Sequence, residues 1–147
     1  MTGSPRRRTL LALALALAVA VPAVAPAATS APRAPKSGWL YRGQPGDVEL
    51  RISGRSVEIA SFSFPCGDVY GRTSVNDFRL KRTTKGYRFN ADAHGLVTYT
   101  DETDNNATVH ISGRFAMDAK TVRGHIRAKS SRCDTGYLKW KGARVKR

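Results

Sequence analysis

Apolar and polar residues alternate along most of the chain after residue 38, which is the pattern of half-buried β-strands. In the segment 47–53, Val48, Leu50 and Ile52 alternate with charged residues. The same two-residue period recurs in the segments 78–91, 109–117, 122–129 and 138–141. Turn-forming Gly, Asn and Asp residues separate these segments, and no strand–helix–strand rhythm is present. The pattern therefore predicts antiparallel sheet.

We expect an all-β domain, either an antiparallel β-sandwich or a small barrel, built from about eight short strands. Residues 39–42 are interpreted as a first edge strand. In the segment 57–66 the apolar positions change phase between Ile59 and Phe62. Such a change predicts a β-bulge near Ala60 or Ser61, or else a strand that is buried on both faces.

The first 27 residues have the order of a secretory signal peptide: a positive start, an apolar run, then small residues. The apolar run, residues 10–21, is shorter than the roughly 20 residues that a membrane span needs. An N-terminal membrane anchor is the alternative, and Sec and twin-arginine export are both left open. We expect an Ala/Pro/Ser-rich linker at 28–37 and a single β domain at 38–147. The mature chain should then be secreted or envelope-associated, outside the cytoplasm.

The chain is strongly basic, with 25 Lys and Arg residues against 11 Asp and Glu residues. Loss of the signal peptide removes three of the arginines, which leaves 22 basic residues and a net charge of about +11. Such a charge favours contact with acidic cell-wall polymers, anionic lipid headgroups or nucleic acid. A purely solubilising role is the alternative, because the charge is spread along the chain.

The two cysteines, Cys66 and Cys133, are interpreted as one disulfide, since an exported chain meets an oxidising compartment and the count is even. A catalytic thiol is the alternative, but no helix start or paired base stands beside either residue. The bond would close a loop spanning 67 positions.

The outward faces of the last two predicted strands carry the candidate binding residues. If these strands are adjacent, one basic surface forms from Arg123, Arg127, Lys129, Lys139 and Lys141. We interpret the chain as a non-enzymatic exported domain that binds an anionic envelope polymer there. Few outward aromatic residues accompany the cations, so no specific nucleic acid is expected. A partner protein is an open alternative, and the sequence leaves the oligomeric state undetermined.

Asp134-Thr135-Gly136 matches the catalytic tripeptide of aspartic proteases, but the match is isolated. Such enzymes need two copies and an apolar surround for the carboxylates, whereas this chain has one copy beside Ser131 and Arg132. Asp and Gly also favour a tight turn, which is the preferred interpretation. No catalytic residue is assigned. A secreted enzyme inhibitor, for example of a protease, and a small hydrolase are the alternative functions.

No metal or cofactor is expected. His94, His110 and His125 lack the spacing of a metal site, although His110 and His125 point outward on two predicted strands. The acidic segment 101–106 lacks the ligand spacing of an EF-hand and is interpreted as a hairpin tip.

Taken together, several short motifs resemble those of small secreted β-rich bacterial proteins, of an actinobacterial type and of unassigned function. The shared residues are Tyr41, Gly43, Cys66, Gly113, Phe115, Gly124, and the ending Cys133-Asp134-Thr135-Gly136-x-x-x-Trp140. The resemblance implies an exported β domain whose two cysteines pair. It implies no catalytic residues.

Overall fold

The computed structural model describes residues 30–101 and 103–146, without the side chains of 103–105. The predicted signal peptide at 1–27 lies outside the described residues. Within them no helix is long and apolar enough to cross a membrane. The described chain forms nine strands: β1 Leu40–Gln44, β2 Val48–Ser53, β3 Ser56–Cys66, β4 Val69–Arg79, β5 Lys81–Thr83, β6 Gly86–Tyr99, β7 Thr103–Phe115, β8 Thr121–Lys129 and β9 Leu138–Arg144.

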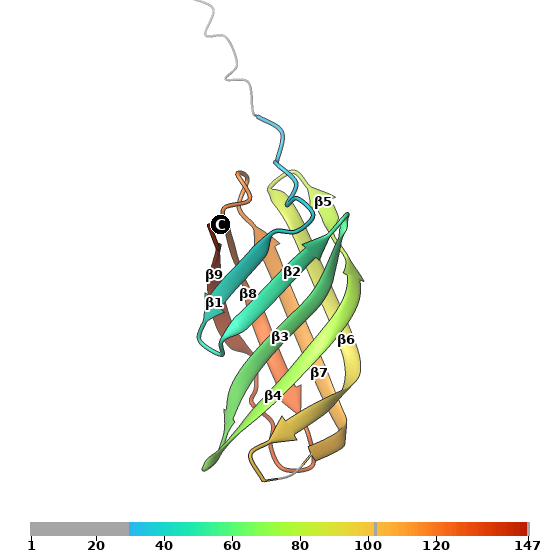
Figure 1. Ribbon diagram of the computed structural model, residues 1–147, viewed down its shortest axis with the longest axis vertical. Coiled ribbons are helices and arrows are strands. Elements are labelled where there is room, and N and C mark those ends of the chain that lie inside the picture. The colour runs from blue at the N-terminus through green and yellow to red at the C-terminus, as the bar shows by residue number, and fades with distance from the viewer. Residues whose placement is uncertain (1–29, 102, 147) are drawn as a thin grey trace, which may run out of the picture.

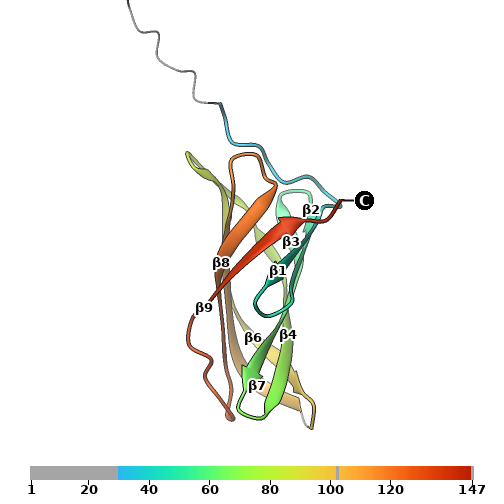
Figure 2. The same ribbon diagram turned by 90° about the vertical axis from the view of Figure 1, so that its left-hand side faces the viewer.

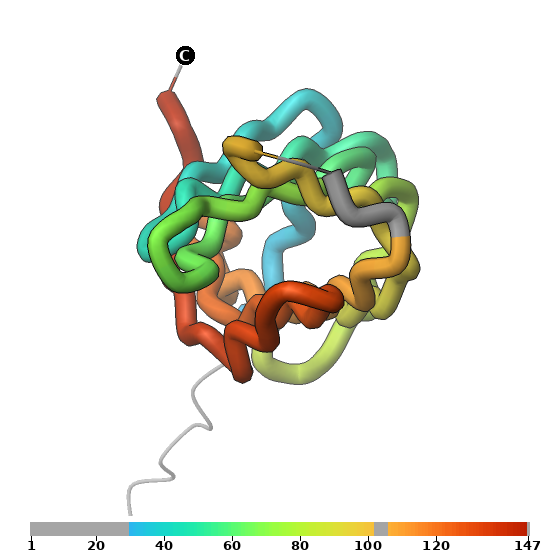
Figure 3. The backbone as a smooth tube through the Cα atoms, turned by 90° about the horizontal axis from the view of Figure 1, so that it is seen from below, coloured from blue at the N-terminus to red at the C-terminus, as the bar shows by residue number. Residues whose placement is uncertain are grey.

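Eight of these strands close into an antiparallel barrel (Figures 1 and 3). Around the ring the order is β1, β2, β3, β4, β6, β7, β8 and β9, and β9 then pairs with β1. The ninth strand, β5, pairs with one end of β6. The all-β prediction is confirmed, and of the two predicted architectures the chain adopts the barrel. The strands are not all short, because β6 extends over 14 residues.

The first strand, β1, is paired on both sides, so the prediction of an edge strand at residues 39–42 was wrong. Tyr41 lies opposite Leu50 of β2 and opposite Arg144 of β9. Gly43 and Gly142 face each other across the β1–β9 seam, where a Cβ on Gly142 would lie 2.8 Å from the carbonyl oxygen of Arg42. Closure pairs the backbone groups that an edge strand would leave exposed.

The core fills the barrel interior with the inward residues of the alternating strands. Large aromatic rings are accommodated by glycines directly opposite them on the next strand. Gly71 lies opposite Phe64, and Gly113 lies opposite Phe89. A Cβ at either glycine would lie 2.5 Å from the facing ring. Each ring thus packs on the backbone of a glycine and occupies the space that a side chain would fill. This arrangement lets a narrow barrel hold several aromatic residues.

The predicted bulge exists, but it lies at Glu58 rather than at Ala60 or Ser61. Along β2, Ile52 pairs with Val57 while Arg51 pairs with Ile59, so Glu58 has no partner there. One extra residue moves the following apolar side chains onto the core face. Ala60 begins that buried set.

The two ends of the barrel are closed differently. At the end near both described termini (Figure 2), the Arg33 amide donates to the Met117 carbonyl, and the Arg144 guanidinium lies 4.2 Å from the Trp39 ring centre. Part of the predicted linker therefore packs on the barrel. At the opposite end a disulfide joins Cys66 to Cys133, with the Cα atoms 5.9 Å apart. This bond confirms the predicted pairing and is compatible with an extracytoplasmic protein.

Candidate functional site

A groove of about 970 Å³ lies on the outer wall formed by β5 to β9. Among the described residues, seven Lys and Arg side chains line it, and no Asp or Glu does. The basic lining residues are Arg79, Lys81, Arg88, Arg114, Arg123, Lys139 and Lys141, accompanied by His125. All of these side chains are exposed.

Five of the cations form one row across five adjacent strands. From β5 to β9, Lys81, Arg88, Arg114, Arg123 and Lys141 are direct cross-strand neighbours. We call these five residues the basic row. Because neighbouring strands are about 4.8 Å apart, the basic row spans roughly 19 Å. A parallel polar row lies two residues along the strands and consists of Asn90, Ser112, His125 and Lys139.

The base of the groove lies between these two rows. Gly113 and Gly124 face each other there, flanked by Phe89 and Trp140 on the outer strands. A Cβ on Gly124 would overlap the carbonyl oxygen of Ser112, so only glycine fits the close approach of β7 and β8. The Trp140 ring is buried, and its indole N–H has no acceptor among the described residues.

The groove cations form no ion pair with a carboxylate of the described residues. Among the described residues, the ion pairs involve Arg42, His110, Lys120, Arg127 and Arg132, none of which lines the groove. Side chains of like charge directly opposite one another on adjacent strands destabilise a sheet by up to about 1 kcal/mol per pair. The basic row contains four such pairs.

The structure brings three of the five predicted binding residues into the groove. Arg123 lies opposite Lys141, and Lys139 lies opposite His125. Arg127 occupies the same outer wall but makes an ion pair with Asp134. Lys129, at the end of β8, does not line the groove.

Four cations of the groove were absent from the predicted set: Arg79, Lys81, Arg88 and Arg114. These four residues alternate with apolar residues along the chain, and this alternation predicts that their side chains point outward to solvent. Their membership of one surface depends on the end of β4 and on β5, β6 and β7 lying on the same side of the barrel as β8, and local sequence patterns do not determine that order.

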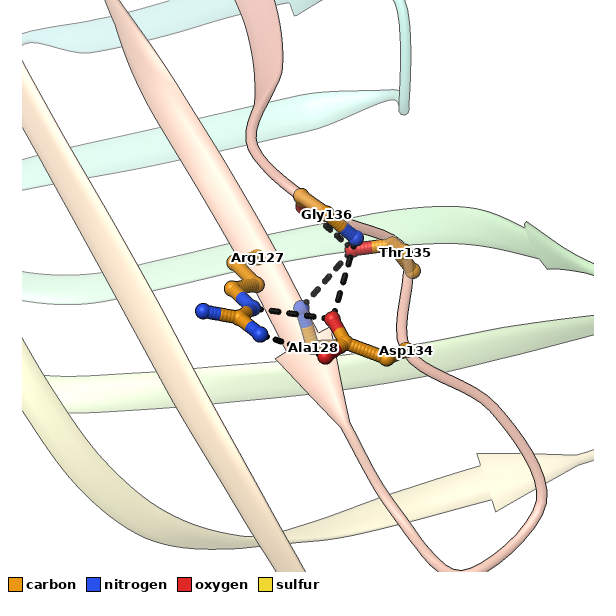
Figure 4. Close-up of polar contacts among 5 residues, drawn as sticks. All are labelled: Arg127, Ala128, Asp134, Thr135 and Gly136. Carbon is orange, nitrogen blue, oxygen red and sulfur yellow. Dashed lines mark hydrogen bonds and ion pairs between the residues drawn. The ribbon is translucent and has the colours of Figure 1, made fainter.

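Asp134 shapes a turn. Its carboxylate accepts a 2.8 Å hydrogen bond from Arg127 Nε, a second from another guanidinium nitrogen of Arg127, and one of 3.0 Å from the Gly136 amide (Figure 4). These donors hold the pKa of Asp134 well below its usual range, with the Arg127 bond as the largest cause. Gly136 has a φ of 62°. A carboxylate bound in this way is a poor proton acceptor and serves the turn.

An exposed aromatic ring lies beside the groove. Tyr137, just before β9, is 59% exposed. Its ring centre is 6.5 Å from that of His125, which lines the groove, and 5.4 Å from that of His110. The guanidinium carbon of Arg127 lies 5.3 Å from the ring centre.

Within the described residues, no three His, Cys, Asp or Glu side chains cluster to hold a metal. The predicted acidic hairpin tip lies partly outside the described residues.

Comparison with known proteins gives no match to a family model, to a curated protein or to a solved structure. The resemblance to small secreted bacterial proteins therefore stays a prediction.

Proposed function

We propose that this protein binds an anionic polymer outside the cytoplasm, with the groove on β5 to β9 as its binding site. The observation that carries the proposal is that, in the described part of the chain, seven Lys and Arg side chains and no carboxylate line the groove. A cleft lined by charge of one sign concentrates its field and attracts ligands of the opposite charge. This proposal enlarges the predicted set of binding residues by the four further cations of the groove, which are Arg79, Lys81, Arg88 and Arg114.

The dimensions favour a polymer over a single small anion. The basic row spans roughly 19 Å across the strands, several times the width of one phosphate or carboxylate group. All five side chains of the row are exposed, so an extended chain can contact successive cations.

The cost of the arrangement also supports binding. Four like-charged cross-strand pairs lower the stability of the free barrel, and no described carboxylate offsets them. A polyanion in the groove would relieve this repulsion. The three arginines at the centre of the row, Arg88, Arg114 and Arg123, have planar guanidinium groups that bind carboxylate or phosphate through paired hydrogen bonds.

The location follows from the predicted signal peptide and is supported by the disulfide, since such bonds persist in oxidising compartments. The polymers available there to a basic domain include acidic components of the cell envelope. We therefore propose an exported, envelope-associated binding protein without catalytic residues.

The test measures binding of the mature protein to inorganic polyphosphate over a range of salt concentrations. The groove variant is Arg114→Gln/Arg123→Gln. Its matched control is Arg51→Gln/Arg55→Gln, which removes the same charge from exposed residues of β2 and the β2–β3 turn. Around the ring β2 lies four strands from β7 in either direction, so Arg51 is on the wall opposite Arg114.

We expect the groove variant to lose roughly tenfold or more in affinity at low salt, because charge-assisted hydrogen bonds contribute about 1.5–3 kcal/mol each. Its plot of log affinity against log salt should be shallower by about 1.4, from roughly 0.7 per lost contact with a flexible polyanion. The control should keep the affinity within about threefold. Equal losses in both variants would show that net charge alone drives binding and would refute the proposed site.

A further inference from the structure

An exposed aromatic ring, that of Tyr137, lies beside the groove. Attraction between the groove cations and an anion gives this ring no role. We propose that the polymer is an anionic polysaccharide and that Tyr137 binds the face of one of its sugar rings. This inference rests on the proposed function and names the chemical class of its ligand.

Tyr137 is held in place although it is largely exposed. Arg127 lies against the ring at 5.3 Å from its centre, and Arg127 is itself anchored by two hydrogen bonds to Asp134 (Figure 4). On another side, His110 meets the ring edge-to-face, and its Nδ1 lies 2.6 Å from the Asp92 carboxylate. Ordering an exposed side chain costs conformational entropy and buries little apolar surface. A fixed aromatic surface of this kind is preorganised for a ligand.

Arg127 therefore has a different role from the one predicted. Its charge is balanced by Asp134, and the Asp134 hydrogen bond is the largest cause that raises the Arg127 pKa. We assign Arg127 as a positioning residue for Tyr137 rather than as a contact for the anionic groups.

The chemistry next to Tyr137 matches an acidic sugar. Tyr137, Lys139 and Lys141 are alternate exposed residues of one segment, so their side chains follow each other at about 7 Å on one face. The C–H groups of a sugar face pack against an aromatic ring, which places an acidic group of the same or the next unit near Lys139. Asn90, Ser112 and His125 of the polar row lie beside this line and can exchange hydrogen bonds with hydroxyl groups.

A single-stranded nucleic acid fits less well. Proteins that bind such strands stack successive bases on several aromatic side chains. The other exposed tyrosine among the described residues, Tyr70 on β4, does not line the groove. The ring of Tyr137 beside the groove cations is better suited to a polymer that carries frequent charges and packs the face of one sugar against the ring.

The test measures binding of the mature protein to two polyanions, inorganic polyphosphate, which contains no sugar, and polygalacturonate, which consists of acidic sugars. An oligothymidylate is included as a single-stranded nucleic acid. Tyr137→Ala removes the ring, Tyr137→Phe keeps it, and Tyr70→Ala is the matched control because Tyr70 is 66% exposed. Melting temperatures establish that each variant is folded.

We expect Tyr137→Ala to weaken polygalacturonate binding about five- to tenfold, in line with other single stacking contacts, and to leave polyphosphate binding within twofold. Tyr137→Phe should bind polygalacturonate nearly as well as the natural protein, and Tyr70→Ala should change neither ligand.

The glycan assignment would be overturned if Tyr137→Ala left polygalacturonate binding unchanged or weakened both ligands equally. It would also be overturned if the natural protein bound polyphosphate but not polygalacturonate, or if Tyr137→Ala weakened only an oligothymidylate. In each of these cases retention of polyphosphate by the groove would still support the proposed function. Failure of the natural protein to bind either polyanion would instead refute both.

Discussion

The disulfide between Cys66 and Cys133 is expected to supply a large share of the stability of this barrel. It joins the β3–β4 hairpin to the β8–β9 loop, and β3 and β9 are separated in the ring by β2 and β1. The bond therefore crosses the end of the barrel instead of joining neighbouring strands. Cys66 is buried, and the Cα separation of 5.9 Å is usual for a disulfide.

The size of the effect follows from the loop that the bond closes. A loop of 67 residues restricts the unfolded chain by about 4 kcal/mol in the chain-entropy model. The net stability of a domain is about 5–15 kcal/mol, so the bond is a substantial part of it. For a domain of this size each kcal/mol changes the melting temperature by about 4 °C, which predicts a decrease of about 15 °C without the bond.

The assay is thermal unfolding followed by circular dichroism. Cys66→Ala/Cys133→Ala and the natural protein in a thiol-free reductant should melt at similarly reduced temperatures, because both open the same loop. Asp134→Ala, with the disulfide intact, should melt well above either, since Asp134 supports one exposed turn. A decrease of less than about 3 °C on opening the disulfide, or an Asp134→Ala protein that melts first, would refute the reasoning.

Two further perturbations test the barrel itself. Gly124→Ala should destabilise the fold by about 1–3 kcal/mol, because the new Cβ meets backbone atoms of Ser112 and Gly113. Gly95→Ala is the control and should cost less than about 1 kcal/mol, because the nearest contact of its new Cβ is a Val109 methyl at 3.3 Å. Equal urea midpoints for the two would contradict the close approach of β7 and β8. Tyr41→Phe should lower stability at pH 7 by about 1 kcal/mol, since the buried phenol donates a 2.7 Å bond to the Ala119 carbonyl. Burial raises the pKa of Tyr41 above its ordinary value of 10.0, so the natural protein should lose this advantage as the pH rises above 10, where only the unfolded phenol ionises. A gap between the two proteins that stays constant from pH 7 to 11 in urea unfolding would argue against a buried phenol.

Much of the fold is encoded locally. The two-residue alternation in segments such as 47–53 and 122–129 predicts strands and their inward faces, because successive side chains of a strand point to opposite sides. The pairing of Cys66 with Cys133 was also predicted from the sequence, since a chain with two cysteines allows one intramolecular disulfide. The same alternation placed the Lys and Arg residues of the groove on the outer surface.

Tertiary structure decided which of these outward residues meet. Arg114 joins Arg88 and Arg123 in one row only because β7 lies between β6 and β8 and because the registers align. Closure of the ring by β1 and β9, which turned an expected edge strand into an interior one, likewise depends on contacts about 100 residues apart. The pairing of Arg127 with Asp134 is a third case, since a turn brings the carboxylate back to β8. Alternation in the sequence determines the face of a strand on which a side chain lies. Strand order and register, which depend on the packing of the whole barrel, determine its neighbours.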